Sequence, residues 1–201
     1  MAIVKQGSHD IPDCMLNIHA LFRYLLCTIL VALLLPTASL ASSIHIVVDT
    51  EHETLSVMRG EIVIRTFEDI AIGRYGKTYF KRKGDNKTPL GSYRIGWINR
   101  ESRYYIFLGL TYPDLPAADR ALQEGRIDAS QWLDIRDAHR AGETPSQSTP
   151  LGGSIGIHGL GRGDLSVHQQ YNWTNGCVAL TNGQLDELLR YARIGTRVEI
   201  R

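Results

Sequence analysis

A histidine and a cysteine, each next to glycine, are the residues of this chain best suited to chemistry. His158 precedes Gly159 and Cys177 follows Gly176, so the two reactive side chains are 19 positions apart. A thiolate attacks carbonyl carbon well, and a nearby imidazole can take the thiol proton. Pairing with an imidazolium can also lower the pKa of a thiol from about 8.5 to roughly 3.5–7.5. The pair therefore predicts a cysteine nucleophile, rich in thiolate at neutral pH, with a histidine general base.

Cys177 has no second cysteine in the domain that we expect to be exported. The other two cysteines, Cys14 and Cys27, lie in the N-terminal segment that an export signal would remove. A lone thiol in an exported protein has no disulfide partner within its chain, which favours a chemical role. An inert, buried cysteine is the alternative interpretation. His168, nine residues before Cys177, is the rival to His158 as the base.

The N-terminal segment has the features of an export signal. Residues 25–35 form an apolar run, and Ser39 and Ala41 provide the small residues of a cleavage site. The run is shorter than the about 20 apolar residues that a membrane-spanning helix needs. We expect residues 1–41 to be a signal peptide, with an uncleaved anchor as the alternative. Residues 42–201 would then be one domain, peripheral to the membrane after export.

The charge balance argues against nucleic acid as the main partner. The chain has 22 Lys and Arg residues against 21 Asp and Glu residues, for a formal net charge of +1. We find no cluster with the spacing of zinc ligands, and we expect neither a metal nor another cofactor. Residues 77–87 are basic and predict a solvated loop, with contact to an anionic polymer as the alternative. The basic residues of this loop are Lys77, Lys81, Arg82, Lys83 and Lys87.

Hydrophobic periodicity predicts a mainly β domain with a few peripheral α-helices. The expected strands are residues 44–48, 55–58, 62–67, 70–73, 93–97, 104–110, 154–157, 177–180 and 197–200. Asp128 is positioned to cap a helix over residues 129–141, and Thr181 forms a capping box with Gln184. Proline in the first turn favours a further helix over residues 116–124. Residues 74–90 and 142–153 are expected to be exposed loops.

This layout puts the two reactive residues at the ends of strands. His158 follows one expected strand and Cys177 begins another, so neighbouring strands would bring imidazole and sulfur together. Gly159 and Gly176 allow close backbone approach and positive φ angles there. Backbone N–H groups around Cys177 would form an oxyanion hole. The polar and aromatic residues expected in one wall of the cleft include Arg162, Tyr171 and Trp173.

Three stretches make the chain resemble the L,D-transpeptidase catalytic domain, the YkuD-like family. They are residues 84–93 (GDNKTPLGSY), 157–159 (IHG) and 172–182 (NWTNGCVALTN). Papain-like enzymes place cysteine before histidine, and the Thr-x-Thr-Cys-like strand of sortases is absent. The resemblance runs from about residue 44 to residue 201. It implies a β-sandwich or barrel with peripheral helices.

The resemblance also implies acyl transfer on peptidoglycan stem peptides in the periplasm or cell envelope. Cys177 would attack a diaminopimelate carbonyl, release D-alanine and form a thioester, which an amine of a second stem resolves. His158 would be base and then acid, oriented by the Gly159 carbonyl. Further support of the site would come from Thr174, Asn175 and Gly176. With water as the acceptor, the enzyme would be a carboxypeptidase or amidase, and a non-catalytic wall-binding protein is a third alternative.

Two positions depart from the pattern of many family members. Asn175 stands where many have histidine, and Ala179 stands where many have arginine. This Gly-Cys-hydrophobic-Ala variant resembles a subgroup that includes enzymes proposed to cleave links to the wall rather than form them. A substrate carboxylate would then be recognised by other residues, with Arg162 and Arg103 as candidates. The helical insert at about residues 115–140 looks longer than in the simplest members, and we expect it to border or cover the cleft.

Overall fold

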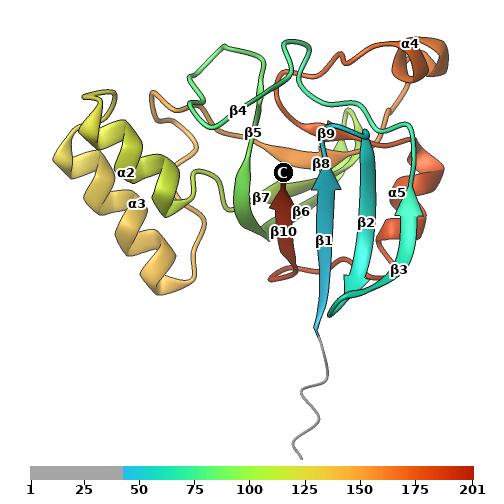
Figure 1. Ribbon diagram of the computed structural model, residues 1–201, viewed down its shortest axis with the longest axis horizontal. Helices are drawn as coiled ribbons and strands as arrows, with labels where there is room; N and C mark the ends of the chain where they lie inside the picture. The colour runs from blue at the N-terminus through green and yellow to red at the C-terminus, as the bar shows by residue number, and fades with distance from the viewer. Residues whose placement is uncertain (1–42) are drawn as a thin grey trace, which may run out of the picture. The chain divides into compact units, whose positions relative to one another are not determined.

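Figure 1 shows the computed structural model, which describes residues 43–201. The signal peptide or anchor expected at residues 1–41 lies outside the described residues. Ser42–Arg201 forms a compact unit of its own. Its hydrophobic core includes Ile46, Leu55 and Leu108. No helix in this part of the chain is long and apolar enough to span a bilayer.

An eight-stranded sheet dominates the domain, as the sequence predicted for a mainly β fold. The strand order is β3-β2-β1-β10-β6-β7-β8-β9, and a separate pair joins β4 to β5. The strands are β1 (Ile44–Asp49), β2 (Thr54–Arg59), β3 (Ile62–Phe67), β4 (Lys77–Thr78), β5 (Thr88–Pro89), β6 (Gly91–Ser102), β7 (Tyr105–Leu110), β8 (Gly156–His158), β9 (Val178–Ala179) and β10 (Arg197–Ile200).

The long strand β6 connects the two halves of this sheet. Its first part pairs antiparallel with β10, from Gly91 to Arg94, and its later part pairs antiparallel with β7, from Ile95 onward. Register shifts interrupt the second pairing, and such bulges bend a strand and increase its twist. β7 then pairs with β8, and β8 with β9. β6 and β7 therefore connect β10 to β8 and β9, the strands in or next to which the reactive residues lie.

Within residues 43–201, four short helices surround the sheet: α2 (Leu115–Gln123), α3 (Ala129–Ala141), α4 (Leu165–Gln170) and α5 (Asn182–Leu188). The predicted N-cap of α3 at Asp128 and the predicted capping box of α5 at Thr181 are confirmed, and Asp128 forms a capping box as well. Figure 1 shows α2 and α3 side by side at the left, with α4 and α5 on the opposite side of the domain. Sequence periodicity did not predict α4, which has only six residues.

The loop at residues 74–90 is less exposed than the sequence suggested. Its two short strands pair with each other, and Thr88 is fully buried, where its hydroxyl accepts a hydrogen bond from the Gly73 amide. Lys81 is only 6% exposed and forms an ion pair with Asp85. The prediction of a solvated loop is therefore wrong for Lys81, because its ammonium finds a carboxylate inside the fold.

The strand expected at residues 70–73 consists of isolated bridges. Ala71 pairs antiparallel with Ala179, and Gly73 pairs parallel with Thr174. These contacts join the start of the loop to the segment that surrounds Cys177. The loop and the cysteine segment therefore support each other, although about 100 residues separate them in the chain.

Candidate active site

Strands β8 and β9 bring the predicted histidine and cysteine into one cavity. They pair in parallel, with Ile157 opposite Val178 and His158 opposite Ala179. Cys177 lies directly before β9, and its Sγ reaches the carbonyl oxygen of Ser154 just before the start of β8. A cavity of about 330 Å³ is lined by both residues. The strand that contains His158 and the strand that follows Cys177 are therefore neighbours, as the proposed pairing of the two residues requires.

His158 is held as a neutral imidazole with a defined orientation. Its side chain is buried, and Nδ1 lies 2.7 Å from the carbonyl oxygen of Gly159. A carbonyl oxygen only accepts hydrogen bonds, so Nδ1 carries the proton and Nε2 keeps its lone pair. Tyr104 stacks on the ring with centroids 4.3 Å apart, and Trp173 presents its edge at 5.7 Å. Burial lowers the pKa of His158 to about 4, so the imidazole can accept a proton at neutral pH.

Cys177 is partly exposed as a residue, and its thiol is a protonated group at neutral pH. Sγ donates a hydrogen bond to the Ser154 carbonyl oxygen at 3.4 Å. Burial raises the pKa of the thiol to about 11, while the Gly156 amide and the Lys81 charge act in the opposite direction. The sequence predicted that the thiol pKa is lowered and that thiolate is abundant, and this prediction is wrong because the pKa is raised. Desolvation of the anion outweighs the favourable groups around the sulfur.

A buried threonine holds the segment that leads to the nucleophile. Thr174 Oγ1 donates to the Cys177 carbonyl oxygen at 2.7 Å and accepts from the Gly176 amide at 3.1 Å. Gly176 has a φ of 124°, and a Cβ there would lie 2.6 Å from the Lys87 carbonyl oxygen. Glycine is therefore required for both conformation and space. The hydrogen bond to Thr174 occupies the Gly176 N–H, whereas the Cys177 N–H lies before the β8–β9 pairing.

Arg74 is a cavity residue that the sequence did not single out. Its Nη2 donates to Asn175 Oδ1 at 2.7 Å and to the Trp173 carbonyl oxygen at 3.2 Å. Arg103 also lines the cavity, so two guanidinium groups face the space beside Cys177. No local motif marked Arg74, because its partners are about 100 residues away.

Ala179 does not line the cavity that contains Cys177. It is fully buried in β9, where its amide donates to the Ala71 carbonyl oxygen at 2.7 Å. Positive charge in the cavity comes from Arg74 and Arg103 instead.

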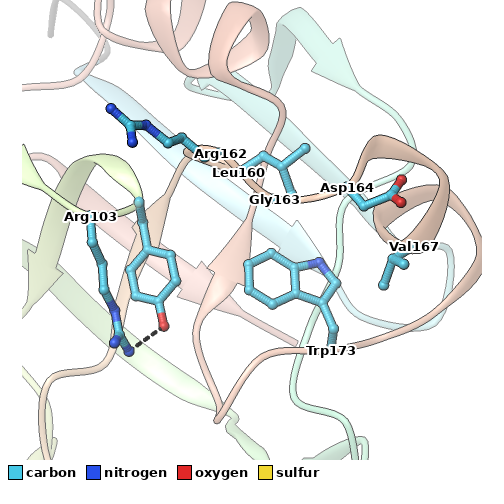
Figure 2. Close-up of a pocket in the computed structure, with 8 residues that line it drawn as sticks. Arg103, Leu160, Arg162, Gly163, Asp164, Val167 and Trp173 are labelled. Carbon is cyan, nitrogen blue, oxygen red and sulfur yellow. Dashed lines mark hydrogen bonds between the residues drawn. The ribbon is translucent and has the colours of Figure 1, made fainter.

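A second pocket of about 510 Å³ adjoins the cavity and shares Arg103, Tyr104 and Trp173 with it. Figure 2 shows Arg103 bonded to the tyrosine beside it, and Nη2 lies 2.7 Å from the Tyr104 hydroxyl. Arg162 lines this outer pocket and not the cavity that contains Cys177. In Figure 2 its guanidinium extends away from Trp173.

The remaining predicted residues lie farther from the sulfur. Tyr171 is 64% exposed and lines neither pocket. His168 is buried on α4, where its Nδ1 accepts a hydrogen bond from Trp173 Nε1 at 3.2 Å. It does not line the cavity, so the geometry favours His158 as the base. Within residues 43–201 no group of three His, Cys, Asp or Glu side chains is arranged to hold a metal ion.

The expectation that the helical insert borders or covers the cleft is wrong. Neither α2 nor α3 contributes a residue to the cavity or to the outer pocket. The insert instead contacts the basic loop, where Arg120 donates to the Tyr79 carbonyl oxygen and Arg126 to the Lys81 carbonyl oxygen. Its two capped helices pack on each other, which keeps them on the far side of this loop.

Solved structures with a similar fold include the following two proteins. The helical cell shape determining protein Pgp2 from Campylobacter jejuni is 22% identical, with a TM-score of 0.52 over 79% of this chain and 47% of that chain. Bd1075 from Bdellovibrio bacteriovorus is 21% identical, with a TM-score of 0.51 over 82% of this chain and 50% of that chain. The present chain thus spans about half of each, and the likeness establishes the fold. No curated protein sequence matches the chain.

The family model of the L,D-transpeptidase catalytic domain, YkuD, matches residues 43–200. This match covers essentially the whole described domain, including β8, β9 and the cavity between them. It agrees with the resemblance carried by the three sequence stretches around His158, Cys177 and residues 84–93. The chain belongs to the L,D-transpeptidase catalytic domain (YkuD) family.

Proposed function

We propose that this protein is a cysteine-dependent acyltransferase of the cell envelope that acts on peptidoglycan stem peptides. The observation that carries the proposal is one cavity that holds the Cys177 thiol and the neutral His158 imidazole. The hydrogen bond of Nδ1 to the Gly159 carbonyl leaves Nε2 as the proton acceptor. A thiol, a base and a residue that orients the base are the parts that nucleophilic acyl transfer needs.

The first half-reaction forms a thioester and releases an amine. His158 Nε2 takes the thiol proton as Sγ attacks the carbonyl carbon of a diaminopimelate residue. The Cys177 N–H donates to the developing oxyanion. When the tetrahedral intermediate collapses, the C–N bond to D-alanine breaks and the imidazolium gives its proton to the leaving amine.

The second half-reaction regenerates the thiol. An amine of another stem attacks the thioester while His158 Nε2 takes its proton, and the C–S bond breaks as that proton returns to sulfur. Arg74 and Arg103 supply positive charge for the carboxylates of the stem peptide. Water in place of the amine would give a carboxypeptidase product by the same steps.

The proposal is tested by incubating Ser42–Arg201 with purified tetrapeptide muropeptides and analysing the products by mass spectrometry. The Cys177→Ala and Cys177→Ser variants are matched controls, since both keep the small side chain and remove the thiol. Loss of D-alanine with a cross-linked dimer, dependent on Cys177, is the expected result. Loss of D-alanine without a dimer would assign the hydrolase. Unchanged muropeptides and no thioester after acid quenching would overturn the proposal.

Export is part of the same proposal, with residues 1–41 as a signal peptide or an anchor. The intact mass of the protein recovered from the cell envelope distinguishes the two, because cleavage after Ala41 leaves Ser42 as the N-terminus. Recovery of the protein in the cytoplasm alone would contradict the envelope location.

A further inference from the structure

A third cavity, of about 660 Å³, is lined by five arginines and shares no lining residue with the Cys177 cavity. It lies where β1 and β10 begin and β2 ends. Figure 1 shows these three strand ends together at the lower end of the sheet, whereas β9 lies toward the upper end. We call its five basic residues the arginine cluster: Arg59, Arg94, Arg190, Arg193 and Arg197.

The charges of the arginine cluster are largely uncompensated. No acidic residue lines this cavity. Among the five, only Arg197 has an ion-pair partner within the described residues, namely Glu199 at 3.4 Å. Arg94 donates to the Gly195 carbonyl oxygen at 3.1 Å, which leaves its charge uncompensated. The chain as a whole has a net charge of only +1, so five arginines around one cavity form a local excess of positive charge.

Exposed apolar side chains accompany the arginine cluster. Ile194 lines the cavity and is 63% exposed. Ile62 is 70% exposed and Val63 is 54% exposed, and Ile62 is paired with Arg59 in the β2–β3 hairpin. Basic groups beside exposed aliphatic groups are typical of surfaces that rest on a bilayer, where guanidinium groups meet phosphates and aliphatic groups enter the interface.

The position of the cluster along the chain also favours a membrane. Ser43 and Ile44 line the cavity, and the apolar run at residues 25–35 ends eight positions before Ser43. Eight residues span at most about 28 Å when fully extended. Whenever the apolar run is in a bilayer, the cluster is therefore tethered within reach of the headgroups.

We propose that the arginine cluster binds the phosphates of anionic phospholipid headgroups and holds the domain against the membrane surface. Guanidinium groups bind phosphate oxygens with paired hydrogen bonds, and five of them around one cavity can engage more than one headgroup. The apolar side chains of Ile194, Ile62 and Val63 would enter the interface. This site is separate from the catalytic cavity and does not depend on the proposed reaction.

Vesicle sedimentation with Ser42–Arg201, which lacks the apolar run, tests this surface directly. Binding to phosphatidylcholine vesicles that contain phosphatidylglycerol is expected, with little binding to phosphatidylcholine alone and loss of binding as salt screens the charges. The variant Arg190→Gln/Arg193→Gln is expected to bind about 25-fold more weakly, from about fivefold for each charge. The matched control Arg82→Gln/Lys83→Gln removes two exposed charges from the basic loop and should bind like the wild type.

Three outcomes would overturn the proposal. They are equal binding to both vesicle types, loss of binding in the Arg82→Gln/Lys83→Gln control alone, and stabilisation by inorganic phosphate without vesicle binding. The last of these would assign a site for free phosphate. Thermal unfolding of each variant verifies that the fold is intact. Cys177→Ala should bind vesicles like the wild type, so failure of the catalytic proposal and failure of this one remain distinguishable.

Discussion

The protonation state of the Cys177 thiol can be measured by following its alkylation with pH. Burial raises the thiol pKa to about 11, compared with about 8.5 for a free cysteine. At pH 7 the thiolate fraction is then about 10⁻⁴ rather than about 0.03, a difference of about 300-fold. Alkylation of the folded enzyme by iodoacetamide is therefore expected to be about 300-fold slower than that of free cysteine at pH 7.

The rate should also continue to rise beyond pH 9, where free cysteine approaches its plateau. The assay is a time course of intact mass between pH 5 and pH 10, with a short cysteine peptide as the reference. The same protein in denaturant is the internal control, because unfolding removes the desolvation and should restore the reactivity of free cysteine. His158, with a pKa of about 4, should add no inflection between pH 5 and pH 8.

A rate that reaches its plateau below pH 7 would refute this reasoning. It would mean that a thiolate–imidazolium pair exists in the resting enzyme and that desolvation is not the dominant effect on the sulfur. Slow alkylation with a half-maximum near pH 8.5 would instead indicate restricted access of the reagent to an ordinary thiol.

Three further changes test other parts of the structure. The folded pKa of buried His158, about 4, lies below the unfolded value of about 6.5, so protonation should remove about 3 kcal/mol of stability as the pH falls from 6.5 to 4. Urea unfolding of the wild type and of His158→Gln at both pH values measures this loss. Equal losses of stability in the two proteins would contradict a buried, neutral His158. Gly176→Ala places a Cβ against the Lys87 carbonyl oxygen at a φ of 124° and should lower the rate of D-alanine release by about 100-fold or more without unfolding the domain. Activity within a few-fold of the wild type would show that the backbone before Cys177 can accommodate the added Cβ. Lys81→Met leaves Asp85 without its ammonium partner and should lower the free energy of unfolding in urea by about 2–3 kcal/mol, which is less than for a fully buried pair because the carboxylate is partly exposed. The control Lys83→Met, at an exposed position, should lower it by less than about 0.5 kcal/mol. Similar losses in the two variants would contradict the role of the ion pair.

Features set by neighbouring residues were predictable from the sequence. Apolar periodicity located β1, β2 and β3. Hydrogen bonding at Asp128 and Thr181 defined the starts of α3 and α5, because a capping box needs only four consecutive residues. The strand character of residues 154–157 and 177–180 followed from the same short-range patterns, whereas the structure shows that β8 and β9 pair in parallel.

Features that depend on distant contacts were not predictable in this way. Tyr104 stacks on His158 only because β7 pairs with β8, and Arg74 reaches Asn175 across about 100 residues. The sequence predicts an exposed Lys81, because its burial depends on the position of Asp85 inside the folded loop. The thiol pKa was mispredicted for a related reason, since residue types show which charges are nearby but not how much water surrounds the sulfur.

A neutral thiol beside a neutral imidazole is compatible with catalysis. The pKa values of about 11 and about 4 place the ion pair about 9 kcal/mol above the neutral pair before the two charges attract each other. Opposite charges at an assumed separation of about 4 Å attract each other by about 4 kcal/mol at an effective dielectric constant of 20. The remaining cost of about 5 kcal/mol fits within the barrier of about 16 kcal/mol that corresponds to a typical turnover of about 10 s⁻¹. His158 would therefore remove the proton during the attack of sulfur on the substrate, and the anionic charge would pass directly to an oxyanion that the Cys177 N–H stabilises.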